Sequence, residues 1–179
     1  NISDGPSGVC YVLVTPDSER TVLTKIGIAY KYDFDLSKLG KTEIFHTSGY
    51  ELLTNPERTK ESIHYAKSEG AKVSFDLSDT TVIIRHKKDL ETVLKKTDIL
   101  FATTEEAEEL VGMHGENSLN ELRHLCPLVA LKMGKDGSIV SNGKDKHIIP
   151  VYNTQVVNTC GAGDAYTAGF LYGHFGIAT

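Results

Sequence analysis

The chain is 179 residues long, with 40% hydrophobic residues, 24% charged residues and a formal net charge of −5. This is the size of one domain and the composition of an ordinary globular protein. The acidic balance argues against broad binding to nucleic acids or anionic membranes, but it leaves room for a small phosphorylated ligand. No apolar run approaches the roughly 20 residues of a membrane-spanning helix. The three cysteines form no CxxC pair, which argues against a zinc site or a disulfide framework and favours free thiols in the cytoplasm.

Strand-like and helix-like segments alternate along most of the chain, which predicts an α/β fold with a mostly parallel sheet. The opening differs, because two β-rich segments, Val9–Thr15 and Arg20–Ala29, are joined by turn-forming residues and are typical of a hairpin. We therefore divide the chain into a hairpin unit over residues 1–30 and an α/β core over residues 31–179. The strands expected in the core are Ile44–Thr47, Lys72–Asp76, Asp98–Ala102, Leu128–Met133, Ser138–Ser141 and Lys146–Ile149.

Helix signals separate these strands. Asn55 is a typical N-cap with Pro56 at the first helical position, and Gly70 is expected to end that helix. Ser118-x-x-Glu121 is typical of a capping box and predicts a helix that starts at Ser118. The last helix is rich in alanine and glycine, which predicts close approach to a sheet or a ligand. The other expected helices are Lys88–Lys96, Thr104–Val111 and Ala162–Phe175.

The most informative segment is Val157–Ala165, in which two glycines lead directly into the last helix. Converging backbone amides and the helix dipole suit an anion at this point, whereas the carboxylate of Asp164 would repel one. A structural interpretation is that Asp164 merely complements the helix dipole. The chemical interpretation is that Asp164 takes a proton from an alcohol that attacks a phosphoryl group held by the amides.

The wider string Asn-Thr-Cys-Gly-Ala-Gly-Asp-Ala-Tyr-Thr-Ala-Gly-Phe-Leu, residues 158–171, resembles the C-terminal signature of the ribokinase-like (PfkB) carbohydrate kinases, which include adenosine kinases. The resemblance implies a three-layer α/β/α fold with a small β lid. It also implies that Asp164 is the catalytic base and that Gly161, Ala162 and Gly163 form the anion hole. ATP and Mg²⁺ are the cofactors that this family uses.

A second candidate element follows the strand at Asp98–Ala102. Thr103-x-x-Glu106 is a capping box by itself. In the kinase family this position carries an Asn-x-x-Glu motif, so the resemblance implies that Glu106 supports Mg²⁺ through water and that Thr103 lies near the cofactor. Thr103 departs from the family's asparagine, whereas a lone glutamate is chemically adequate for an ion that keeps most of its water.

The segment Leu131–Gly137 is a third candidate, although its glycine turn is also an ordinary hairpin signal. It resembles the family's strand and Gly-x-x-Gly turn along the nucleotide. The resemblance implies that Gly134 and Gly137 contact ATP, with Lys132 or Lys135 near phosphate.

One further residue, Asn158, and one further segment, residues 48–50, correspond to site positions of the family. Asn158 stands where the family usually has the aspartate of a monovalent-cation site, so potassium activation is not expected to be retained unless the amide oxygen ligates the ion. Ser48, Gly49 and Tyr50 end a strand where family members approach substrate. An ordinary end-of-strand loop is the alternative interpretation of these three residues.

The hairpin resembles the lid that covers the sugar in this family, and such lids sometimes pair between subunits, which makes a homodimer a hypothesis. Family members begin with a further βαβ block and continue past this C-terminus with helices, and the chain is expected to lack both parts. It begins at Asn1 rather than at methionine, which indicates a processed or cropped polypeptide.

The leading hypothesis is an ATP-dependent kinase that phosphorylates a hydroxymethyl group of a sugar or nucleoside, with no nucleic-acid or membrane partner. The alternative is a kinase-like protein that binds a nucleotide or sugar with little or no turnover, which the departures at Asn158 and Thr103 favour. The pattern argues against a dinucleotide-binding oxidoreductase, because no GxGxxG with an acidic residue downstream follows the first strand and the glycine motif precedes the last helix instead.

Overall fold

The computed structural model describes residues 4–15, 20–31, 35–152, 155–156 and 159–176. These residues belong to two compact units, Asn1–Gly40 and Lys41–Thr179. Among the described residues, no helix is both long enough and apolar enough to cross a membrane.

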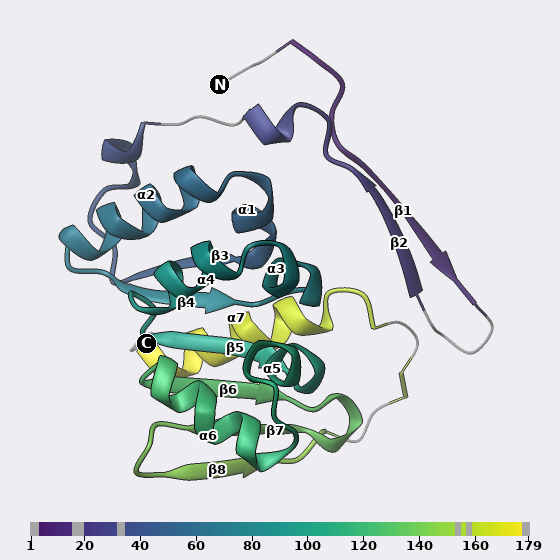
Figure 1. Ribbon diagram of the computed structural model, residues 1–179, viewed down its shortest axis with the longest axis vertical. Coiled ribbons are helices and arrows are strands. Elements are labelled where there is room, and N and C mark those ends of the chain that lie inside the picture. The colour runs from purple at the N-terminus through teal and green to yellow at the C-terminus, as the bar shows by residue number, and fades with distance from the viewer. Residues whose placement is uncertain (1–3, 16–19, 32–34, 153–154, 157–158, 177–179) are drawn as a thin grey trace. The chain divides into compact units, whose positions relative to one another are not determined.

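The first unit contains the predicted hairpin, in which β1 (Val9–Val14) pairs antiparallel with β2 (Arg20–Lys25) (Figure 1). The second strand ends earlier than predicted. Gly27 turns the chain with a φ of +60°, and a Cβ at this position would lie 2.5 Å from the Pro6 carbonyl oxygen. Short 3₁₀ helices, Gly27–Lys31 and Leu36–Leu39, follow this turn.

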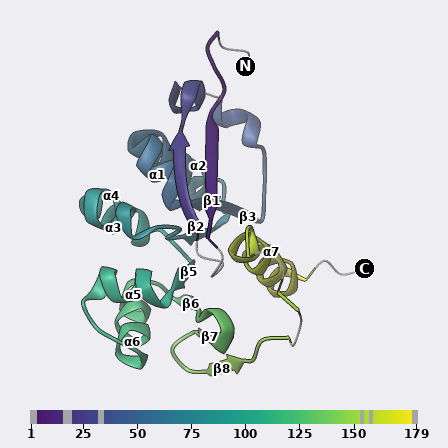
Figure 2. The same ribbon diagram turned by 90° about the vertical axis from the view of Figure 1, so that its right-hand side faces the viewer.

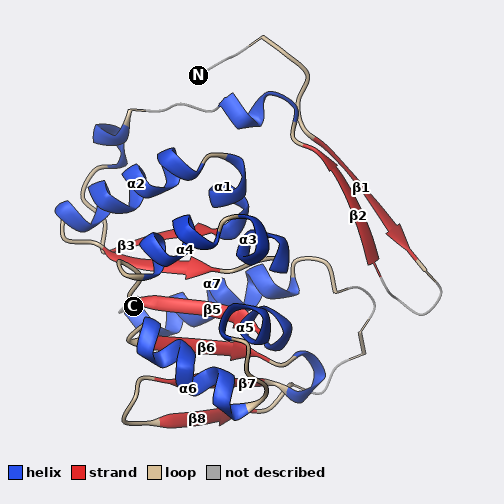
Figure 3. Ribbon diagram, in the orientation of Figure 1, coloured by secondary structure: helices blue, strands red, loops and turns tan. Residues whose placement is uncertain are grey.

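The second unit is built on one six-stranded sheet with the strand order β3-β4-β5-β6-β7-β8 (Figure 3). The first four strands are parallel, and β7 and β8 are antiparallel additions at one edge. All six strands were predicted from the sequence, with bounds that differ by at most one residue at each end. The strands are β3 (Ile44–Ser48), β4 (Lys72–Asp76), β5 (Ile99–Thr103), β6 (Leu128–Lys132), β7 (Ser138–Ser141) and β8 (Lys146–Ile149).

Helices cover both faces of this sheet, so the expected three-layer α/β/α arrangement is confirmed. Of the α-helices within the described residues, six pack on one face, and α7 lies on the opposite face (Figure 2). The helices are α1 (Gly49–Thr54), α2 (Pro56–Ser68), α3 (Thr80–Arg85), α4 (Lys87–Leu94), α5 (Thr104–Val111), α6 (Glu116–Leu125) and α7 (Ala162–Phe175), and a short 3₁₀ turn spans Gly134–Asp136.

The two faces of β5 show how the sheet divides the core. Leu100 and Ala102 point into the larger apolar cluster beneath α1–α6. Ile99 and Phe101 point into a smaller cluster on which α7 packs, and the Phe101 ring meets the Phe170 ring edge-on at 5.2 Å. Both clusters depend on the alternation of side chains along a strand that is buried on both faces.

Helix starts follow their capping residues, with one correction. The Asn55 side chain accepts a hydrogen bond from the Arg58 amide at the start of α2, as predicted. The prediction that a helix starts at Ser118 is wrong, because α6 begins at Glu116 and the buried Ser118 hydroxyl donates back to the Gly115 carbonyl. Helices α1 and α3 were not predicted. Each has six residues, too few to show a clear amphipathic period.

The glycines of α7 do not all mark a close approach. A Cβ added to Gly169 or Gly173 would meet no described atom within 4 Å. These two positions therefore do not approach the sheet closely, and of the two predicted reasons for the small residues only approach to a ligand stays open there. Among the described residues, Tyr166, Phe170, Leu171 and Phe175 make the apolar contacts of α7 instead.

Candidate active site

The carboxyl ends of the four parallel strands gather polar side chains at one edge of the sheet. The last residues of β3, β4, β5 and β6 are Ser48, Asp76, Thr103 and Lys132. Helix α7 begins at the same edge (Figure 1), and its Thr167 hydroxyl reaches the Asp76 carboxylate. Ligands of open α/β sheets bind outside the carboxyl ends of the strands, so this edge is the candidate site.

Asp76 lies at the centre of this edge and is 7% exposed. One carboxylate oxygen, Oδ2, accepts from Lys132 Nζ at 2.7 Å and from Thr167 Oγ1 at 3.2 Å. The other oxygen accepts from the Ser78 amide at 3.0 Å. Asp76 was not among the site residues predicted from the sequence. A carboxylate that ends a buried strand was the signal that could have revealed it, because such a group needs partners.

The start of α7 is exposed and has no side-chain cap among the described residues. Gly161 adopts the left-handed conformation with a φ of +76°, and its carbonyl accepts the first helical hydrogen bond, from the Ala165 amide at 2.9 Å. The Ala162 amide donates to the Thr159 carbonyl at 3.2 Å, so it is not free for a ligand in this conformation. The amides of Gly163 and Asp164 belong to the first turn, where helical amides have no intrahelical acceptor.

Asp164 shares its surroundings with other carboxylates, as the electrostatics of two neighbouring residues show. Burial raises the pKa of the Tyr50 hydroxyl, and Asp79, Glu106, Asp164 and Asp76 raise it further in that order. The carboxylates and Tyr50 therefore belong to one local environment.

His46 reports on the same environment from strand β3. Burial lowers the pKa of its imidazole, although Asp76, Glu51 and Asp164 oppose that effect. Lys132 contributes in the same direction as burial. The site therefore combines several carboxylates with a lysine that is already paired with Asp76.

Thr103 and Glu106 form the predicted capping box of α5. The Thr103 amide donates to Glu106 Oε2 at 2.8 Å, and the Glu106 amide donates to Thr103 Oγ1 at 3.2 Å. Glu106 is 6% exposed, and burial raises the pKa of its carboxyl group despite the Thr103 amide and Lys132. The structural interpretation of this motif is thus realised, with one glutamate oxygen engaged by the cap.

A hydrated magnesium ion fits this set of donors. Among the described residues, no three histidine, cysteine or acidic side chains come together as direct metal ligands. Mg²⁺ keeps several waters and commonly uses one or two protein carboxylates, so it needs no such cluster. The carboxylates around Tyr50, including Glu106, favour a cation beside them.

The turn that follows Lys132 contains two glycines, Gly134 and Gly137, whose surroundings differ. Gly134 has a φ of +58°, and a Cβ there would meet no described atom within 4 Å, which leaves space for a ligand. Gly137 has a φ of +89°, and a Cβ there would lie 2.1 Å from the Ile149 carbonyl oxygen. Packing against β8 therefore accounts for Gly137 without a nucleotide. Lys135 is exposed in the same turn.

The three residues expected near substrate start α1 at the same edge. Ser48 caps this helix, and its amide and hydroxyl both donate to Glu51. Gly49 is required by packing, because a Cβ would lie 2.2 Å from the Leu77 carbonyl oxygen. Tyr50 is 54% exposed. Asn158, the expected monovalent-cation position, lies outside the described residues.

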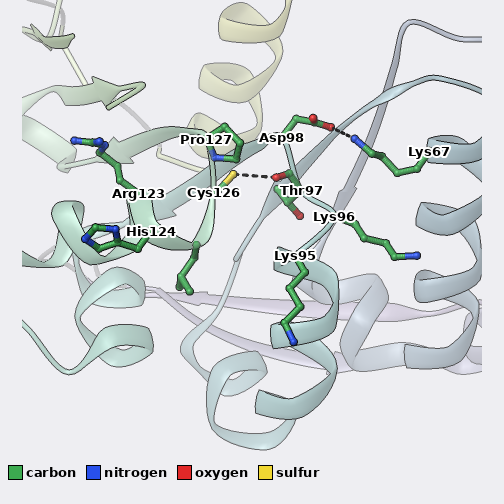
Figure 4. Close-up of a pocket in the computed structure, with 10 residues that line it drawn as sticks. Lys67, Lys95, Lys96, Thr97, Asp98, Arg123, His124, Cys126 and Pro127 are labelled. Atoms are coloured by element: carbon green, nitrogen blue, oxygen red, sulfur yellow. Dashed lines mark hydrogen bonds and ion pairs between the residues drawn. The ribbon is translucent and has the colours of Figure 1, made fainter. Parts of the chain in front are cut away.

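Two cavities formed by the described residues lie elsewhere. A cavity of about 630 Å³ opens at the amino ends of β5 and β6, where Lys67 pairs with Asp98 and the Cys126 thiol donates to the Thr97 carbonyl (Figure 4). Lys95 and Lys96 line it, but their ammonium groups diverge (Figure 4). A second cavity, about 360 Å³, lies between α7 and strands β7 and β8. Neither is lined by Asp164.

A family profile described as "pfkB family carbohydrate kinase" matches residues 1–175. The chain belongs to the pfkB family of carbohydrate kinases. An uncharacterized sugar kinase of Archaeoglobus fulgidus is 28% identical over 176 residues, which are 96% of this chain and 70% of that protein. An ATP-dependent 6-phosphofructokinase of Thermoanaerobacterium thermosaccharolyticum is 33% identical over 140 residues, which are 74% of this chain and 44% of that protein.

Solved structures of a sugar kinase and an adenosine kinase have the same fold. A probable sugar kinase of Rhizobium etli superposes with a TM-score of 0.87 at 26% identity, and the adenosine kinase of Sinorhizobium meliloti with a TM-score of 0.85 at 28% identity. Each match covers 94% of this chain and 54% of the other, so the chain spans about half the length of these kinases. The expected ribokinase-like fold is confirmed.

Proposed function

We propose that the protein carrying this chain is an ATP-dependent kinase that phosphorylates a hydroxymethyl group of a sugar or nucleoside. The observation that carries the proposal is the position of Asp164 at the carboxyl edge of the sheet, exposed in the first turn of a helix that has no side-chain cap among the described residues. Membership of the pfkB family supports the reaction type, and the phosphofructokinase and adenosine kinase relatives support the two substrate classes.

Asp164 has the chemistry that the transfer requires. The substrate hydroxyl oxygen attacks the γ-phosphorus, the bond to the β-phosphate oxygen breaks, ADP leaves, and the hydroxyl proton passes to the Asp164 carboxylate. Phosphoryl transfer is largely dissociative, so a carboxylate that orients the alcohol and accepts its proton late is sufficient. The amides of Gly161, Gly163 and Asp164 and the dipole of α7 stabilise the charge on the transferring group.

Glu106, one of the carboxylates around Tyr50, is the residue that would hold Mg²⁺, through water. When bound, the ion neutralises charge on the ATP phosphates. Gly134 provides open space beside the nucleotide, and the exposed Lys135 is better placed than the paired Lys132 to reach a phosphate from this turn.

The exposed apolar side chains of the hairpin support the proposal that it acts as a lid and forms a dimer. Its two faces are both apolar and exposed, with Tyr11, Leu13 and Leu23 on one face and Val12 and Val22 on the other. A lid over substrate would cover one face, and we propose that a second copy of the chain covers the other. Sedimentation equilibrium tests the dimer, and a monomeric mass throughout the micromolar range contradicts it.

A kinase-like binding protein is the second candidate. It is favoured by the Ala162 amide, the capping-box oxygen of Glu106 and the Lys132 ammonium, all of which have protein partners in this structure. Such a protein would bind a nucleotide without the tight closure that catalysis requires.

An ADP-release assay separates the two candidates. The polypeptide that includes these 179 residues is tested with MgATP against a panel of sugars and nucleosides, beside the variant Asp164→Asn. A general base contributes about 10²- to 10⁴-fold, so the variant should lose turnover by that factor while it still binds MgATP. Near-normal turnover in the variant contradicts the role of Asp164, and binding without turnover in the wild type supports the second candidate.

A further inference from the structure

Thr167 is a buried residue in a largely exposed stretch of α7. Its exposed fraction is 3%, whereas Asp164, Ala165 and Ala168 on the same helix are exposed. Its hydroxyl donates to Asp76 Oδ2 at 3.2 Å, across 91 residues of sequence. The helix is therefore tied to the sheet by a directional bond at this position as well as by apolar packing.

Thr167 and Asp164 are three residues apart, so their side chains lie on the same side of α7. A bond that fixes the rotation of the helix at Thr167 therefore also fixes the direction in which Asp164 points. The apolar contacts of α7, such as those of Tyr166 and Phe170 with Phe101, are less directional and tolerate a small rotation of the helix.

The acceptor of this bond is itself held in place. The side chains of Asp76 and Lys132 are 10% and 14% exposed, and their ion pair measures 2.7 Å. Lys132 also lies against the first turn of α7, because a Cβ at Gly163 would be 3.7 Å from its ammonium nitrogen. The ion pair thus meets α7 at two successive turns, Gly163 and Thr167.

We propose that Thr167, Asp76 and Lys132 act together as a positioning device, the Thr167 anchor, that sets the rotation of α7 and so aims Asp164 and the first-turn amides at the reacting phosphoryl group. The inference rests on the proposed kinase function. Within it, Thr167 is a positioning residue, and Lys132 serves as the counter-ion of Asp76 instead of a direct phosphate ligand.

The test removes the hydroxyl without changing the shape of the side chain. Thr167→Val deletes the bond, Thr167→Ser restores it, and Thr92→Val makes the same change on the exposed face of α4, where the hydroxyl donates only to the Lys88 carbonyl among the described residues. The variants are made in the polypeptide that includes this chain. Each is measured for thermal unfolding, kcat and KM for ATP, and for the amide signals of Gly161 and Gly163 after selective ¹⁵N-glycine labelling.

We expect Thr167→Val to lower kcat by about tenfold, the scale of one hydrogen bond to a charged group, with KM for ATP changed less than about twofold. The signals of Gly161 and Gly163 should move in this variant, return toward their wild-type positions in Thr167→Ser, and stay in place in Thr92→Val. A merely structural role would lower the unfolding temperature and leave kcat and these signals unchanged.

Two results decide different claims. If Thr167→Val leaves the signals of Gly161 and Gly163 in place, the anchor is overturned whatever the activity. If the wild type transfers no phosphate while the two signals still respond as expected, the proposed function fails but the anchor stands as the device that sets the rotation of α7.

Discussion

The two edges of the central sheet use charged side chains in different ways. At the amino edge, Asp98 accepts hydrogen bonds from Lys67 at 2.7 Å and from the Val73 amide at 2.8 Å, with Lys72 at 3.4 Å. At the carboxyl edge, the carboxylates around Tyr50 include Asp164, for which no hydrogen-bond partner is found among the described residues. At the amino edge, hydrogen bonds compensate the charge of Asp98 and stabilise the fold. At the carboxyl edge, the carboxylate of Asp164 remains available to a ligand.

Asp76 is the exception at the carboxyl edge, because it is paired and buried like the charges at the amino edge. This difference separates two kinds of acid within the candidate site. Asp164 is exposed and faces solvent or a ligand, whereas Asp76 supports the groups around it. Substitution of Asp164 should therefore lower turnover, whereas substitution of Asp76 should lower the free energy of unfolding.

The largest expected effect on stability is at Asp76. Asp76→Asn leaves the Lys132 ammonium buried without its counter-ion, which should lower the free energy of unfolding by about 3–5 kcal/mol. Urea unfolding measures the loss, with Asp136→Asn as a control at an exposed aspartate. The double variant Asp76→Asn with Lys132→Met should recover much of the loss, because it removes the unpaired charge. No recovery would mean that the pair itself, and not its charge balance, holds this edge.

A smaller effect is expected at the amino edge. Burial alone would raise the pKa of the Asp98 carboxyl, but the hydrogen bonds from Lys67 and the Val73 amide, with Lys67 and Lys72 nearby, lower it below its ordinary value of 3.8. Asp98→Asn should therefore cost about 1.5–3 kcal/mol of unfolding free energy at neutral pH, the range for hydrogen bonds to a charged group.

The pH dependence of this loss has a definite sign. A lowered pKa in the folded state means that the stabilisation by Asp98 is complete above pH 3.8 and is lost as the pH falls through the folded value. The difference between wild type and Asp98→Asn should be constant from pH 7 to 5 and shrink near pH 3. Glu57→Gln, at an exposed ion pair with Lys60, is the control and should change stability far less than Asp98→Asn does at neutral pH. A difference that grows on acidification would contradict the assignment.

Much of the fold and part of the site could be predicted from the sequence. The buried strands β4, β5 and β6 are short apolar runs bounded by turn signals, and the glycine motif locates the start of α7 at Ala162. The Thr167 anchor could not be predicted, because its bonds join Asp76 to residues 56 and 91 positions away. No local pattern records such contacts. Glu106 shows a further limit, since the same residue pattern fits both the helix cap that the structure shows and the magnesium site that we propose.

The smallest expected effect concerns the thiols, of which one lies near each edge. Burial raises the pKa of the Cys126 thiol, at the amino edge, to about 12, so only about one molecule in ten thousand carries the reactive thiolate at pH 8. Cys160 is exposed beside the first turn of α7. In a Cys10→Ser background, which removes the exposed thiol of the hairpin, a thiol reagent should label Cys160 and spare Cys126 in the native protein.

Nucleotide binding can be tested at the same two cysteines without requiring turnover. If phosphates of ADP occupy the start of α7, MgADP should slow the labelling of Cys160 and leave Cys126 unlabelled, because only the carboxyl edge is covered. Sodium chloride at matched ionic strength is the control for general screening. Labelling of Cys160 at the same rate with and without saturating MgADP would place the nucleotide away from α7. The carboxyl edge would then differ from the amino edge in its charges but not in nucleotide binding.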